Sequence, residues 1–176
     1  MGTRWHPYAA EVVGTFILVL FGTGSVAAAV FTDAQVGLWQ VAVVWGFGVT
    51  LAIYATASVS GAHLNPAVSL AFAILRPDDF PRSRLLPYWG AQLLGAALGG
   101  VAVLAAFHPF IERFEEDQRL VRGEAGSQAS AMAFGEYFPN PAMFGADDRA
   151  FELVSPLMAV SVEAFLSEDN PSSTPG

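Results

Sequence analysis

Three long stretches of this sequence carry no Asp, Glu, Lys or Arg, and they constrain the fold more than any other feature. They are Val12–Thr32, Ala34–Leu75 and Leu85–Ile111. A helix that crosses the hydrocarbon core of a bilayer needs roughly 20 consecutive, mostly apolar residues. In water such apolar faces would stay exposed at a large cost, whereas a bilayer buries them. We therefore predict an all-α integral membrane protein.

The charges that remain are few and unevenly placed. Charged residues make up 14% of the chain, against about a quarter in an average soluble domain. The net charge is −8, and half of the 16 acidic residues belong to a segment that we interpret as a solvated loop: Glu112, Glu115, Glu116, Asp117, Glu124, Glu136, Asp147 and Asp148. The basic residues are all Arg and form no cluster along a helix, so a nucleic-acid partner is not expected.

The composition gives little support for an enzyme or for a metal-binding protein. The chain has no Cys, which excludes a disulfide framework, thiolate catalysis and a Cys-based metal site. His6, His63 and His108 are scattered along the chain, without the spacing of a nucleophile–base pair or of metal ligands. We expect no enzyme activity, no metal site and no cofactor.

The apolar stretches divide into helices of two lengths. We predict full spans over about Tyr8–Phe31, Leu38–Ala57 and Leu85–Phe107. The middle stretch is too long for one span and too short for two, and polar, Gly- and Pro-containing residues interrupt it at 58–66. The apolar piece that follows, Ala67–Leu75, has about half the length of a bilayer-spanning helix.

The first span could instead be a signal peptide. Arg4 precedes it, and Ala27–Ala29 is similar to a cleavage site of small residues. However, its apolar run is longer than a usual signal-peptide core and a second span follows almost at once, which favours a retained helix.

Arginine placement predicts the orientation of the spans. Arg76, Arg82 and Arg84 lie in one short connector, whereas the first connector carries only Asp33. Short loops rich in Arg face the cytoplasm, so we expect this connector and the N-terminus inside and the first connector outside. The two connectors lie on opposite sides if one full span and one re-entrant segment separate them. Ala67–Leu75 is therefore predicted to be a re-entrant half-helix.

The residues before the half-helix indicate a pore. Non-helical backbone at membrane depth must line a water-filled cavity or be buried in protein. Asn65 is a strong N-cap residue and Pro66 is favoured at the first helical position, so the positive dipole end of the half-helix is expected here. The Asn65 side chain would cap the helix and keep its NH2 group for a solute. The carbonyl groups of Gly61, Ala62 and His63 would offer acceptors.

The run Ser60–Val68, which reads SGAHLNPAV, resembles the first of two signature loops of the major intrinsic protein family of aquaporins and glycerol facilitators. Asn65, Pro66 and Ala67 form the signature tripeptide. The resemblance extends over about Tyr8–Leu166. It implies six spanning helices and two half-helices in inverted repeats, with tetramers that have one pore per subunit. It also implies a passive channel for glycerol, other small neutral solutes or water in the plasma membrane.

Trp45 bears on the choice of permeant. Glycerol-conducting members of the family place a Trp at their outer constriction, where water-selective members usually have Phe. The resemblance therefore implies that Trp45 lines the pore, where an indole can pack against the carbon chain of a polyol. The alternative is a Trp of the interfacial belt.

Glu11 lies near the start of the first predicted span, and Glu163 lies in the start of a fourth helix that we predict over 151–166. A charge inside a membrane span is costly and usually functional. The family pattern has a Glu at the places of Glu11 and Glu163, and the resemblance implies that each supports a signature loop by accepting backbone hydrogen bonds. For Glu11 the alternative is an interfacial acid that reaches the headgroups. Gln92, and Gly95 with Gly99, are interpreted as helix-packing residues.

The signature tripeptide occurs a second time, at Asn140–Ala142, but the surroundings differ. No apolar half-helix follows, and Met143 stands where the second loop of the family has Arg. The segment is more similar to the outer loop of glycerol facilitators, so we do not expect a pore motif here.

The resemblance covers the amino-terminal half of the family fold. We predict a first repeat at 1–107, an extracellular loop at 108–150, the start of a fourth helix at 151–166 and a polar tail at 167–176. We expect the second half of the pore to be absent from this chain. Two functions remain open: a channel of the family type, homotetrameric once its pore is complete, or a non-conducting remnant or half-channel that needs a partner.

Overall fold

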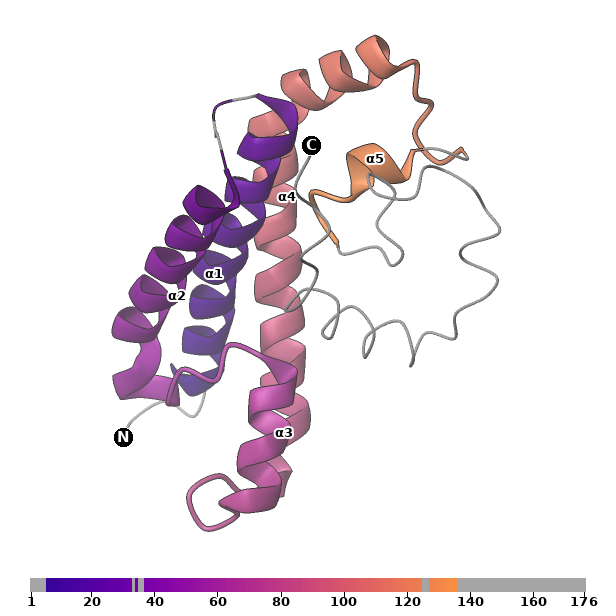
Figure 1. The fold of residues 1–176 in the computed structure, drawn as a ribbon. Coiled ribbons are helices and arrows are strands. Elements are labelled where there is room, and N and C mark those ends of the chain that lie inside the picture. The colour runs from indigo at the N-terminus through magenta and orange to yellow at the C-terminus, as the bar shows by residue number, and fades with distance from the viewer. Residues whose placement is uncertain (1–5, 33, 35–36, 125–126, 136–176) are drawn as a thin grey trace, which may run out of the picture. The chain divides into compact units, whose positions relative to one another are not determined.

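The computed structural model describes residues 6–32, 34, 37–124 and 127–135 of the 176-residue chain (Figure 1). Every regular element in this part is a helix, which confirms the all-α prediction. The elements are α1 (His6–Phe31), α2 (Leu38–Ser60), α3 (Pro66–Leu75), a short 3₁₀ turn at Arg82–Arg84, α4 (Leu85–Gln118) and α5 (Gln128–Ala131). The chain separates into two units, one ending at Ile111 and one beginning at Glu112.

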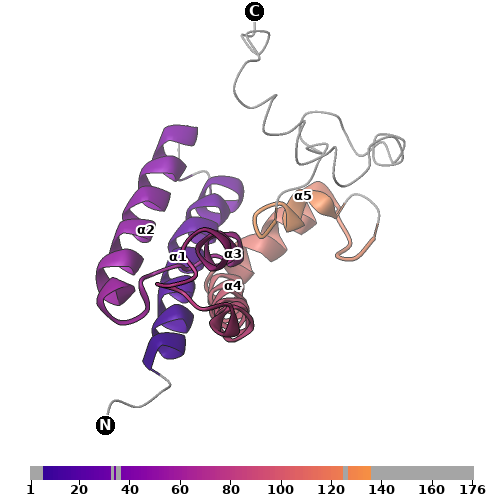
Figure 2. The same cartoon turned by 90° about the horizontal axis from the view of Figure 1, so that it is seen from below.

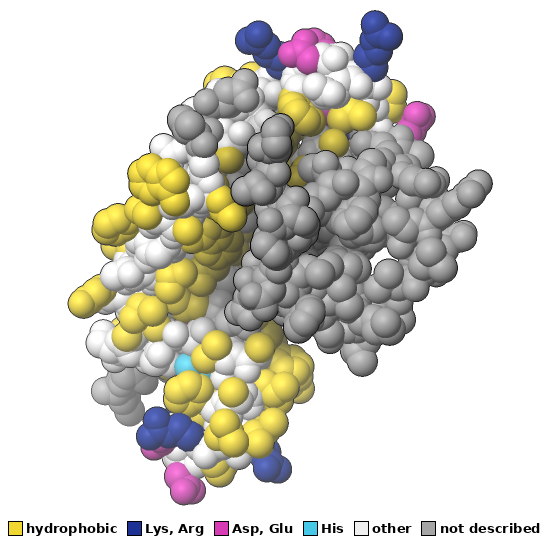
Figure 3. All heavy atoms as spheres, in the orientation of Figure 1, with side chains coloured by type: hydrophobic (Ala, Val, Ile, Leu, Met, Phe, Trp, Pro, Cys, Tyr) yellow, Lys and Arg dark blue, Asp and Glu magenta, His cyan; other side chains and the backbone are white. Residues whose placement is uncertain are grey.

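Among the described residues, three helices are long and apolar enough to cross a bilayer, as predicted: α1, α2 and α4 with the turn before it. Much of their apolar surface is exposed. On α2, Trp39, Phe47 and Tyr54 are exposed to 67%, 72% and 83%, and hydrophobic side chains are spread over the visible faces of α2 and α3 (Figure 3). Soluble monomers rarely expose so much contiguous apolar area, so this surface fits the hydrocarbon of a bilayer.

The short helix α3 runs toward the same end of the first unit as the end of α2 does. The start of α1, the end of α3 and the Arg82–Arg84 turn lie toward one end, and the end of α1 and the start of α2 lie at the other (Figure 1). From the start of α2 the chain forms one long helix, turns at residues 61–65 and adds the half-length helix α3. This is the arrangement that the sequence predicts for a re-entrant half-helix.

Glycines allow the long helices to approach closely. α1 lies between α2 and α4 (Figures 1 and 2). A Cβ atom at Gly95 of α4 would overlap the carbonyl oxygen of Val12, and one at Gly99 would lie 2.9 Å from Cβ of Val19. On the other side of α1, a Cβ atom at Gly48 of α2 would likewise crowd an α1 side chain. Gly95 and Gly99 therefore serve helix packing, as the sequence indicates.

α4 continues beyond the predicted end of the third span. The sequence predicts a helix to Phe107 and a polar loop after it, whereas α4 runs through Pro109 to Gln118. Proline removes one main-chain hydrogen bond and favours a bend. The following residues are nevertheless mostly good helix formers, and Arg113 and Asp117 form an i,i+4 ion pair at 3.8 Å. Acidic residues were therefore a poor indicator of a loop at this point.

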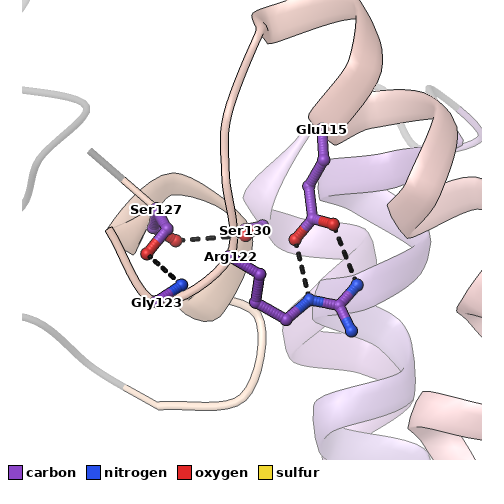
Figure 4. Close-up of polar contacts among 5 residues, drawn as sticks. All are labelled: Glu115, Arg122, Gly123, Ser127 and Ser130. Atoms are coloured by element: carbon purple, nitrogen blue, oxygen red, sulfur yellow. Dashed lines mark hydrogen bonds and ion pairs between the residues drawn. The ribbon is translucent and has the colours of Figure 1, made fainter. Parts of the chain in front are cut away.

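In the second unit, an ion pair closes the turn after α4. Arg122 donates two hydrogen bonds to Glu115, from Nε at 3.1 Å and from Nη2 at 2.9 Å (Figure 4). The hydrogen bond to Glu115 raises the pKa of Arg122 above its ordinary value. Gly123 N donates to Ser127 Oγ, and Ser130 Oγ donates to the Ser127 carbonyl. These bonds order the chain between α4 and α5.

Candidate functional site

The segment between α2 and α3, here called the 61–65 loop, has an unusual backbone. Gly61 follows α2 with a φ angle of 85°, and Ala62 and Leu64 also have positive φ angles, of 51° and 54°. Gly adopts positive φ readily, but a residue with a Cβ atom is strained there by about 1–3 kcal/mol. Such a conformation persists only where the surrounding contacts determine it. The contacts of this loop define the candidate site.

Glu11 of α1 binds the loop from inside the helix bundle. Its side chain is completely buried. One carboxylate oxygen accepts a hydrogen bond from His63 N at 3.0 Å and the other from Leu64 N at 2.7 Å. Gln92 Nε2 of α4 donates to the second oxygen at 2.8 Å. Three donors satisfy a carboxylate that would otherwise be very costly to bury, and they join α1, α4 and the loop.

The imidazole of His63 is buried among aromatic rings. Its centroid lies 4.6 Å from those of Phe72 and Phe80 and 5.2 Å from that of Tyr88. Its Nδ1 lies 3.1 Å from Ser69 Oγ. The sequence points only to the carbonyl group of His63, but in the structure its ring also anchors the loop against α3 and α4.

Asn65 is the N-cap of α3, and Pro66 is the first residue of that helix. Asn65 Oδ1 accepts a hydrogen bond from Ala67 N at 2.8 Å. The residue is exposed, and its NH2 group has no hydrogen-bond partner among the described residues. The positive end of the α3 dipole lies at the same place. The start of α3 therefore presents a free donor beside a partial positive charge.

Three consecutive carbonyl groups of the loop are also free. Within the described part of the chain, no donor is hydrogen-bonded to the carbonyl oxygens of Gly61, Ala62 or His63. The amide groups of the same three residues all donate to atoms of α1 or α2. These three residues thus use their donors within the protein and leave their carbonyl oxygens without a hydrogen-bond partner in the described part of the chain.

Trp45 and Glu163 are not brought to this loop by the described contacts. Trp45 is half-buried, and its indole packs on Gly22 of α1, where a Cβ atom would lie 2.5 Å from the ring. No hydrogen bond or ring contact joins Trp45 to the loop within the described ranges. Glu163 and the second tripeptide, Asn140–Ala142, lie outside the described residues.

Gln92 has a larger part in the site than the sequence indicates. Its side chain is 1% exposed, and Nε2 donates both to Glu11 and to Ser69 Oγ, the latter at 2.9 Å. Its Oε1 is buried without a described partner. The one signal in the sequence is a polar residue inside an apolar span, which often marks function. No spacing rule points from Gln92 to Glu11, because the two belong to different helices.

The chemistry of the site suits uncharged solutes. No group of three or more His, Cys, Asp or Glu side chains is placed to hold a metal ion in the ranges that the structure describes. The one carboxylate, Glu11, is buried and occupied by donors. What remains for a solute is a set of neutral acceptors and one neutral donor.

We predict that Glu11→Gln loosens the loop. The amide keeps the size of the side chain but turns an NH2 group toward a backbone N–H. A hydrogen bond to a charged group contributes about 1.5–3 kcal/mol, so amide exchange at His63 and Leu64 is expected to accelerate at least about tenfold. Glu116→Gln, at an exposed residue of α4, is the matched control. Wild-type exchange rates in Glu11→Gln would contradict the role of the carboxylate.

Comparison with known proteins gives a family match over nearly the whole chain. The model of the family described as Major intrinsic protein matches residues 2–171. The Glycerol uptake facilitator protein of Pseudomonas aeruginosa is 39% identical over 161 residues, which are 91% of this chain and 56% of the relative. The protein of the same name from Escherichia coli K12 is 36% identical over 160 residues, again 91% and 56%.

A relative with another named permeant also matches. The Propanediol uptake facilitator of Salmonella typhimurium is 38% identical over 128 residues, which are 73% of this chain and 48% of the relative. The chain therefore spans about half the length of the curated relatives that it matches.

Proposed function

We propose that this chain, which belongs to the major intrinsic protein family, lines a passive transmembrane pathway for glycerol and similar small neutral solutes. The observation that carries the proposal is the set of free groups at the 61–65 loop. Three carbonyl oxygens and the Asn65 NH2 group have no described partner, and the positive end of α3 lies beside them. Relatives named for the uptake of glycerol and of propanediol support the same class of permeant.

Such a site replaces the hydration of a polyol by hydrogen bonds to the protein. Hydroxyl groups of the solute donate to the carbonyl oxygens of the loop and accept from Asn65. Each replacement of a hydrogen bond to water by one to the protein contributes a net free energy of only about 0.5–1.5 kcal/mol. The solute therefore binds weakly enough to leave again. A cation is disfavoured, because the positive end of the α3 dipole repels it.

Trp45 is proposed to form an apolar wall of the same pathway. Its packing on Gly22 restrains the orientation of the indole. A flat, half-buried ring offers the carbon chain of a polyol an apolar surface while the hydroxyl groups turn toward polar partners.

A half-channel that conducts only with a complementary segment is the second candidate. The open face of the site favours it, because Gly61, Asn65 and Ala67 are exposed. In channels built from inverted repeats, two half-helices meet near the bilayer midplane. The complement would be a segment related to the remainder of the family fold, and the completed pore is proposed to form homotetramers.

Glycerol uptake by vesicles that contain the purified chain, compared with protein-free vesicles, tests the proposal, and in whichever preparation conducts we predict that Asn65→Asp reduces this uptake at least about tenfold. The substitution removes the NH2 donor and adds a charge. Gln118→Glu, at the exposed end of α4, controls for the added charge.

Uptake at the protein-free rate would reject a channel formed by this chain alone. Co-reconstitution with the part of the Pseudomonas aeruginosa relative that lies beyond the matched segment would then test the half-channel. Uptake that needs both pieces supports it, and uptake absent from the mixture rejects it.

We expect Trp45→Phe to lower the ratio of glycerol to water permeability several-fold in whichever preparation conducts, because the smaller ring offers a polyol less apolar surface. Stopped-flow swelling of vesicles in glycerol and shrinkage in sucrose measure the two rates. Trp39→Phe, at an exposed residue of the same helix, is the control. An unchanged ratio would leave Trp45 as a packing residue or a residue of the interfacial belt.

We also propose that the protein lies in the plasma membrane with its N-terminus and the connector containing Arg82–Arg84 in the cytoplasm, since short Arg-rich loops stay inside. The chain has no Cys, so Ser83→Cys and Glu124→Cys each introduce a single label site. An impermeant thiol reagent added to intact cells is expected to label the Glu124→Cys variant alone. Labelling of the Ser83→Cys variant alone would show the opposite orientation.

A further inference from the structure

We infer that Tyr88 and Trp89 of α4 are positioning residues that fix the two ends of the 61–65 loop, and thereby the spacing between its free acceptors and the Asn65 donor. The inference rests on the proposed function, because it concerns the same site. Neither residue is part of the signature tripeptide, and neither needs to touch the solute to act in this way.

Tyr88 holds the end of α2. Its hydroxyl donates to the Ser60 carbonyl at 2.8 Å. The last carbonyl groups of a helix have no partner within the helix, so Tyr88 supplies one where the chain leaves α2. The residue is 1% exposed, and its ring is packed edge-on against Tyr8 and Phe80, with centroids at 5.7 Å and 4.8 Å. A ring enclosed in this way directs its hydroxyl to one place.

Trp89 holds the start of α3. Its indole N–H donates to the Pro66 carbonyl at 3.0 Å. Pro66 directly follows Asn65, whose NH2 group is the free donor of the site. Consecutive side chains of a helix point about 100° apart, which lets the neighbours Tyr88 and Trp89 reach carbonyl groups on either side of the loop.

The two contacts lie on either side of the free carbonyl groups. Among the carbonyl groups from Ser60 to Pro66, the outermost two are bonded to α4. Leu64 O accepts from Thr15 Oγ1 of α1 at 3.5 Å and Asn65 O from Ser69 N at 3.1 Å. The three carbonyl groups from Gly61 to His63 have no hydrogen-bond partner among the described residues. Glu11 binds two amide groups in the middle of the same loop. The strained backbone is thus held at both ends by α4 and at its centre by α1, so the helices set its geometry.

Amide hydrogen exchange of the full chain in lipid nanodiscs tests the inference. Tyr88→Phe removes the hydroxyl and keeps the ring, and we expect exchange at Ala62 and His63 to accelerate about five- to tenfold. Trp89→Phe removes the indole N–H, and the same acceleration is expected at Ala67 and Ser69. The loss of one hydrogen bond corresponds to a factor of about this size.

Tyr54→Phe and Trp39→Phe are the matched controls, since they make the same replacements at exposed residues of α2. They are expected to leave exchange in the loop unchanged. Wild-type exchange in both α4 variants, or equal acceleration in the controls, overturns the inference.

Glycerol transport gives the readout that a purely structural role would leave unchanged. In a conducting preparation, Trp89→Phe is expected to lower glycerol uptake about fivefold while the thermal unfolding temperature stays at the wild-type value. A loosened loop with wild-type uptake overturns the positioning role. If the wild-type protein itself shows no uptake, the proposed channel activity fails, and the exchange experiment still decides whether Tyr88 and Trp89 hold the loop.

Discussion

The contact between the Glu11 carboxylate and two amide groups of the 61–65 loop is the interaction on which the rest of the site depends. A chain within a bilayer can leave helical structure only where its backbone groups find other partners. The loop contains two residues with a Cβ atom at positive φ, so it does not keep this shape by itself. By accepting from His63 and Leu64, the carboxylate satisfies two amide groups of the loop, while the carbonyl groups of Gly61, Ala62 and His63 have no partner among the described residues.

The close approach of α1 and α4 makes this contact possible. Glu11 and Gln92 are buried on the two helices, and Gly95 and Gly99 of α4 lie where a methyl group would crowd α1. A larger residue there would separate the helices, and hydrogen bonds weaken steeply with such displacement. Lipid provides little hydrophobic driving force for helix association, so close van der Waals packing takes its place. The glycines thus support the site without touching it.

The polar groups of the site fall into two sets with different roles. Backbone amide groups, the Gln92 amide and the one carboxylate are bonded to each other inside the unit. The carbonyl oxygens of Gly61, Ala62 and His63 and the Asn65 NH2 group are free among the described residues. No charge remains among the free groups, and the end of α3 beside them is positive. This division favours a solute that can both donate and accept hydrogen bonds and disfavours a cation.

The sequence by itself determined the membrane fold and the place of the loop. The apolar stretches indicate the number of spans, and Asn65–Pro66 marks the start of α3. Both features can be recognised because each is contained in one continuous segment of the sequence. It did not determine the end of α4, which lies at Gln118 rather than Phe107, because charged helix formers suit a solvated helix as well as a loop. Nor did it identify the α4 side chains that hold the loop. Gln92 and Glu11 are 81 residues apart, and whether such residues meet depends on how the helices cross, which only the tertiary structure decides.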